Sequence, residues 1–69
     1  MDSDTLQSAR SRYAAAYDAY LECAKRVSQK LQDGIAPTVD EIAAEQGARE
    51  RLAIARRKLI DAINSSMAR

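Results

Sequence analysis

The sequence contains no histidine, phenylalanine or tryptophan, and its 69 residues include one cysteine, one proline and two glycines. Without histidine, the chain cannot form a Ser-His-Asp triad or a zinc site that uses imidazole ligands. Cys23 has no second cysteine with which to form an intramolecular disulfide. The chain also lacks a glycine-rich loop of the kind that binds phosphate. We therefore expect no catalytic residue, no metal site, no cofactor and no enzyme activity.

Strong charge of either sign and long apolar runs are also missing. Lys and Arg total 11 against 10 Asp and Glu, so the net charge is +1 and gives no overall attraction to nucleic acid or to an anionic membrane. No apolar run approaches the roughly 20 residues that a membrane span needs. The acidic start, residues 1–4, is not followed by the apolar stretch of a signal peptide. These features predict a cytoplasmic protein that does not bind membranes.

One break divides the chain, the segment from Asp33 to Thr38. The segments on either side have helical periodicity, so we predict a single all-α domain over residues 1–69, with a helix over 4–33, a turn over 34–37 and a helix over 38–67. Gly34 stands where a left-handed residue closes a helix. Thr38 and Glu41 have the spacing of a capping box. So short a turn between two helices of similar length predicts an antiparallel αα-hairpin.

The first helix has one clear apolar stripe, in which large residues and alanines alternate at heptad spacing. The large residues of this repeat are Leu6, Tyr13, Tyr20 and Val27. Small residues between them allow a facing helix to approach closely. We expect Cys23, on the same stripe, to act as a small buried apolar residue.

The second helix is less regular, because its seven-residue series reads Ile42, Arg49, Arg56, Ile63. This series predicts two arginines in the centre of the apolar stripe, with Arg49 near Tyr20 and Arg56 near Tyr13. Arginine over a tyrosine ring would fix the register of the hairpin or of a dimer. The alternative is that both guanidinium groups bind a carboxylate, a phosphate or an acidic helix.

A hairpin of this size has too small a core to be stable without a disulfide, a metal or a partner, and the partner is the option that the composition leaves. We predict a homodimer that forms a four-helix bundle and serves as a protein–protein interaction module, such as an adaptor, a chaperone-like subunit or a regulator. An obligate subunit or inhibitor in a heteromeric complex is the alternative. The expected interaction face comprises Leu6, Tyr13, Tyr17, Tyr20, Val27, Leu31, Ile42, Arg49, Leu52, Arg56, Leu59, Ile60 and Ile63.

Basic residues concentrate in the middle of the second helix, where the hairpin would bring the start of the first helix beside them. They predict a basic patch that could bind RNA or DNA, which gives a second alternative function. The near-zero net charge weighs against nucleic acid as the partner. The patch would contain Arg10, Arg12, Arg51, Arg57 and Lys58.

Overall fold

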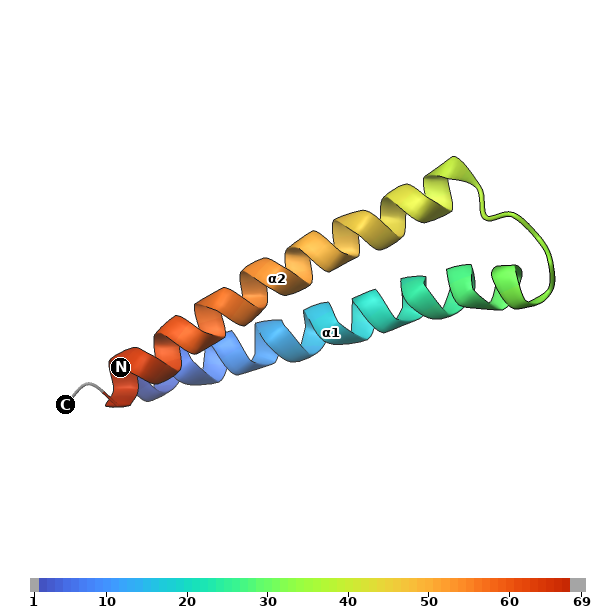
Figure 1. The fold of residues 1–69 in the computed structure, drawn as a ribbon. Helices are drawn as coiled ribbons and strands as arrows, with labels where there is room; N and C mark the ends of the chain where they lie inside the picture. The colour runs from blue at the N-terminus through green and yellow to red at the C-terminus, as the bar shows by residue number, and fades with distance from the viewer. Residues whose placement is uncertain (1, 68–69) are drawn as a thin grey trace.

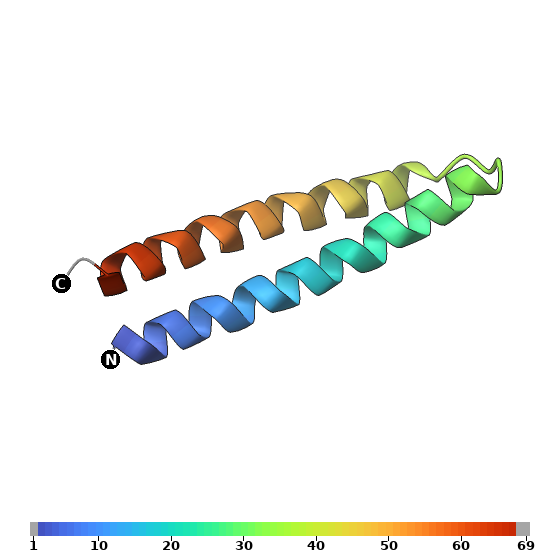
Figure 2. The ribbon, with the colours of Figure 1, turned by 60° about the horizontal axis from the view of Figure 1, so that its bottom comes forward.

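Two antiparallel α-helices account for nearly the whole chain in the computed structural model, which describes residues 2–67 and the side chains of residues 5–67. Helix α1 spans Asp2–Gln32 and helix α2 spans Val39–Met67, and the described residues contain no strand. The helices lie side by side, with both termini at one end and the turn at the other (Figures 1 and 2). The hairpin measures 53 × 14 × 14 Å. The predicted all-α hairpin is therefore confirmed, with helix boundaries that shift by one or two residues.

The turn is built as the sequence predicts. Gly34 has a φ of 74°, the left-handed conformation that glycine adopts without strain. The Ile35 N–H donates to the Lys30 carbonyl at 2.7 Å and the Gly34 N–H donates to the Leu31 carbonyl at 3.1 Å, which is the Schellman pattern that closes a helix. These two bonds satisfy carbonyl groups that the end of α1 would otherwise leave unpaired.

Helix α2 begins with the predicted capping box. The Glu41 N–H donates to the Thr38 hydroxyl oxygen at 3.1 Å, and the Thr38 N–H donates to Glu41 Oε1 at 2.9 Å. Asp40 and Glu41 also lie in the first turn, where carboxylates interact favourably with the helix dipole. Both ends of the connection are thus fixed by hydrogen bonds within the twelve residues from Lys30 to Glu41.

The two helices meet along a narrow line of contact, which we call the seam. On α1 its less exposed residues follow the predicted heptad; on α2 they also recur at intervals of three and four. Only Val27, 8% exposed, and Ala48, 2% exposed, are buried among the described residues. The seam consists of Leu6, Ala9, Tyr13, Ala16, Tyr20, Cys23, Val27 and Lys30 on α1 and of Glu41, Glu45, Ala48, Leu52, Ala55, Leu59 and Ala62 on α2.

Large and small residues alternate along each side of the seam. Arg49 lies over the Tyr20 ring, so these two residues lie at a similar height along the hairpin. The small residues of the two helices line the same groove: Ala9, Ala16, Ala55 and Ala62. Small residues at these positions let the helices approach closely.

The prediction that Arg49 and Arg56 lie in the centre of the α2 stripe is wrong. The inward series is Glu41, Ala48, Ala55 and Ala62, one position earlier than the predicted series, and both arginines are exposed. The physical reason is that α2 carries two adjacent apolar stripes. More of its large apolar residues belong to the outer stripe than to the seam, so the apolar pattern of the sequence alone indicates a direction between the two stripes.

Candidate functional site

Most of the large exposed apolar side chains of the hairpin lie outside the seam, in two stripes that run the length of the helices. On α1, Tyr17, Leu21 and Leu31 are exposed, and each lies on a line of residues spaced by three and four. On α2, the line with the same spacing runs through Ile42, Arg49, Ala53, Arg56, Ile60, Ile63 and Met67. Its isoleucines and its methionine are exposed to between 40% and 78%.

Both stripes lie on the same face of the hairpin. The stripes on the other side of the seam, which include Ser8 and Arg12 of α1 and Arg51 and Lys58 of α2, line one shared groove. Because the helices are antiparallel and both right-handed, the two remaining edges must share the opposite face. We call this the open face, formed by Arg10, Ala14, Tyr17, Leu21, Ala24, Leu31, Ile42, Arg49, Ala53, Arg56, Ile60, Ile63 and Met67.

The open face carries positive charge near its middle. The Arg49 guanidinium carbon lies 6.0 Å from the centre of the Tyr20 ring, and its Nη2 is 3.7 Å from Glu45 Oε1. The predicted proximity of Arg49 and Tyr20 is therefore confirmed. The corresponding cation–π contact between Arg56 and Tyr13 does not form; the Tyr13 ring instead lies 6.1 Å from the Tyr17 ring.

The predicted interaction face is divided by the fold. Six of its residues lie in the seam and hold the hairpin together: Leu6, Tyr13, Tyr20, Val27, Leu52 and Leu59. The other seven lie on the open face: Tyr17, Leu31, Ile42, Arg49, Arg56, Ile60 and Ile63. Leu21, which the sequence reasoning did not include, joins the open face because it follows Tyr17 by four residues. That spacing is present in the sequence, but the neighbouring heptad stripe of α1 contains more large apolar residues, and the prediction followed that stripe.

The opposite face carries a groove of about 960 Å³ near the ends of the helices away from the turn. Its floor is made of small residues such as Ala9, Ala16, Ala55 and Ala62, and Arg12, Arg51 and Lys58 line it. We call this side the groove face. The fold thus brings together three members of the predicted basic patch, in the company of one carboxylate, Asp61.

The other two members of the predicted basic patch lie elsewhere. Arg10 lies on the open face, seven residues before Tyr17, and lines a shallow hollow with Tyr13, Ala14 and Leu59. Arg57 is exposed and does not line the groove. The five cations therefore do not form one surface.

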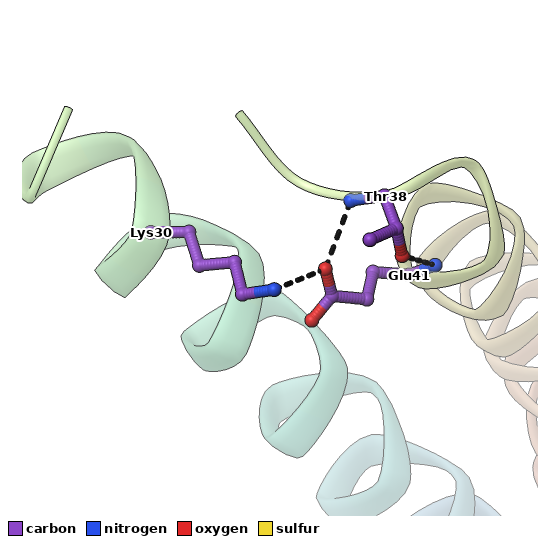
Figure 3. A network of polar contacts seen from close by, with 3 residues as sticks. All are labelled: Lys30, Thr38 and Glu41. Carbon is purple, nitrogen blue, oxygen red and sulfur yellow. Dashed lines mark hydrogen bonds and ion pairs between the residues drawn. The ribbon is translucent and has the colours of Figure 1, made fainter. Parts of the chain in front are cut away.

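A polar cluster at the turn joins the two helices (Figure 3). Lys30 Nζ donates to Glu41 Oε1 at 2.5 Å, and the same oxygen accepts the Thr38 N–H. The hydrogen bond from Lys30, followed by that from the Thr38 backbone, lowers the pKa of Glu41 from its ordinary 4.5 to about 2. Glu41 is therefore ionised at neutral pH and ties the end of α1 to the start of α2.

The described residues contain no cluster of three or more metal-ligating side chains, and neither helix has the length and hydrophobicity that crossing a membrane requires. Cys23 is a free thiol, half-buried in the seam. No protein family, curated protein or solved structure matches this chain.

Proposed function

We propose that this protein is a non-enzymatic interaction module that pairs with a second copy through its open face to form a four-helix bundle, and that acts as a small adaptor, chaperone-like subunit or regulator. The observation that carries this proposal is the gathering of seven large exposed apolar side chains on one face of the hairpin: Tyr17, Leu21, Leu31, Ile42, Ile60, Ile63 and Met67. Contiguous apolar surface of this kind is typical of a site that another protein covers.

The total surface area supports a partner of about this size. The hairpin exposes 5468 Å², whereas a compact monomer of 7.6 kDa is expected to expose about 4,300 Å². The excess, about 1,200 Å², is comparable to the roughly 800 Å² that each partner buries in a standard interface. A second copy has the same apolar face, so two copies can cover each other's open face without a different protein.

The test measures mass and helicity over a series of protein concentrations, by light scattering and circular dichroism. We expect a helical dimer of about 15 kDa, twice the chain mass. Ile60→Asp should abolish the dimer, because it puts a charge within the covered apolar face. Ile54→Asp is the matched control: Ile54 is an exposed isoleucine of the same helix, on the groove face.

The outcomes separate the alternatives. A dimer that survives Ile60→Asp but not Ile54→Asp would show that the wrong face has been assigned. A monomer at all concentrations would exclude self-pairing and favour an obligate subunit of a heteromeric complex, which should gain stability when its partner is added.

A second candidate function is binding of RNA or DNA through the groove face. The observation in its favour is that Arg12, Arg51 and Lys58 converge on one groove, although the chain as a whole carries a net charge of only +1. Such binding should weaken steeply with salt. Arg51→Gln should reduce it and Arg57→Gln, outside the groove, should reduce it less; no binding at low salt would exclude this function.

A further inference from the structure

We infer that the two copies associate with their turns at the same end of the bundle, so that α2 of each copy packs against α1 of the other and the partner's Tyr17 lies between Arg49 and Arg56. This inference rests on the proposed function and gives it a defined geometry. It follows from how side-chain size and charge are distributed along the two stripes of the open face.

Closed symmetry limits the possibilities to two. A dimer that buries the same face of both copies has a two-fold axis in the plane of the interface. If this axis runs along the hairpin, the turns lie at the same end and α2 faces the partner's α1. If it runs across the hairpin, the turns lie at opposite ends, α1 faces the partner's α1, and α2 faces the partner's α2. Neighbouring helices are antiparallel in both cases.

Side-chain size favours the first arrangement. On α1 two of the three large residues of the open face, Tyr17 and Leu21, lie at mid-length, and the third, Leu31, lies next to the turn. On α2 the largest ones, such as Ile42 and Ile63, lie toward the ends, and the middle is occupied by Ala53. An α1 stripe placed over an α2 stripe therefore brings the bulky side chains at mid-length to a small one.

Register makes this match specific. Since Arg49 lies at the height of Tyr20, Ala53 lies about 6 Å nearer the termini, close to the height of Tyr17. An axis along the hairpin permits no shift between the copies, so the partner's Tyr17 faces Ala53. Arg49 and Arg56 stand on either side of that small residue, on the same stripe of α2. A tyrosine ring in this position meets both guanidinium groups.

Charge argues against the second arrangement. The midpoint of α2 is Ala53, so an axis across the hairpin at mid-length places Arg49 against the partner's Arg56. It also places Tyr17, the midpoint of α1, on the partner's Tyr17. Juxtaposed like charges cost several kcal/mol at an interface. The described open face offers no Asp to relieve them, and its neighbour Glu45 is already paired with Arg49.

The arrangement is tested by measuring the distance between two spin labels, one on each copy. Ala36 in the turn is exposed and is changed to cysteine for labelling, in a Cys23→Ala background that removes the native thiol. With the turns at the same end, the labels should lie within about 25 Å, given interhelical distances of 8–10 Å. With the turns at opposite ends, they should be separated by nearly the full length of 53 Å.

A second labelling position distinguishes the failure of this inference from that of the proposed function. Ala19, exposed and near the middle of α1, should give a similar distance in both arrangements. A measured distance at position 19 with a long one at position 36 would overturn the same-end arrangement while leaving the dimer intact. No distance between copies at either position, with a monomeric mass, would overturn the dimer itself.

The role of the tyrosine is tested by Tyr17→Leu, which keeps apolar area and removes the aromatic ring. We expect the dimer dissociation constant to rise about 2- to 30-fold, the range of a cation–π contact. Arg49→Met and Arg56→Met should show no additional loss in the Tyr17→Leu background. Full additivity of these changes would overturn the contact between them.

Discussion

We call the length over which α1 and α2 run side by side the shaft of the hairpin. The turn and the shaft differ in how completely the chain hydrogen-bonds or buries its own residues. At the turn, a Schellman closure, a capping box and the Lys30–Glu41 pair meet the needs of both helix ends within one short segment. Along the shaft, only Val27 and Ala48 are buried among the described residues. The chain therefore specifies its own topology locally and leaves most of its large apolar side chains exposed.

The largest effect should come from the seam, where few residues hold the shaft together. Leu59→Ala should lower the free energy of unfolding by about 2 kcal/mol, the low end for such truncations because Leu59 is half-buried. Urea denaturation, at one fixed protein concentration for both proteins, provides the measurement. Ile54→Ala, on the exposed groove face, serves as the control and should change stability by less than about 0.5 kcal/mol. Equal effects of the two changes would mean that the seam is not the core.

The next effect concerns the turn itself. Gly34→Ala should destabilise the hairpin by about 1 kcal/mol, because alanine is strained at a φ of 74°. No atom lies within 4 Å of the added Cβ, so steric contact contributes nothing. The thermal midpoint measures the change, and an unchanged midpoint would show that the turn does not limit stability.

A smaller effect of opposite sign is expected in the shaft. Gly47→Ala should raise stability by about 0.5–1 kcal/mol, the usual gain of alanine over glycine inside a helix. The added Cβ would meet Arg51 Nη2 at 3.6 Å, an ordinary contact. A loss of stability on this substitution would mean that another backbone approaches Gly47 in the assembled protein. Such a loss would contradict the assignment of the open face as the covered one.

The smallest effect is that of pH at the turn, since solvent screens a pair at the surface. The folded pKa of Glu41, about 2, lies below its ordinary 4.5, so ionised Glu41 stabilises the folded state at neutral pH. That contribution is present above about pH 4.5 and is lost as the pH falls toward 2. Glu41→Gln keeps the cap but removes the charge, so the difference in thermal midpoint between wild type and variant should shrink over this window. A constant difference would contradict the ion pair.

The sequence was sufficient to predict the hairpin because the signals that end the first helix and start the second act locally. Gly34, Pro37, Thr38 and Glu41 each act within a few residues, and the structure bears out the cap and the left-handed glycine. The seam of α1 was also predictable, since one stripe of that helix holds most of its bulky apolar residues.

The assignment of faces on α2 could not be made from the sequence. Three isoleucines of α2 are larger and more apolar than the alanines beside them, Ala48, Ala55 and Ala62. Hydrophobicity alone therefore predicts that the face with Ile42, Ile60 and Ile63 packs against α1. What decides the packing is the size of the residues opposite. That fit depends on both helices together, so the stripe of one helix alone does not reveal it.

The position of the groove on the side opposite the open face has a consequence for valency. Two copies joined through the open face carry two identical grooves that point in opposite directions, each lined by Arg12, Arg51 and Lys58. Two helix layers separate the grooves, a thickness of about 20 Å. A single acidic ligand long enough to pass around the bundle would bind the second groove at a high effective concentration. With shorter ligands, the dimer would instead bind two of them, one at each groove.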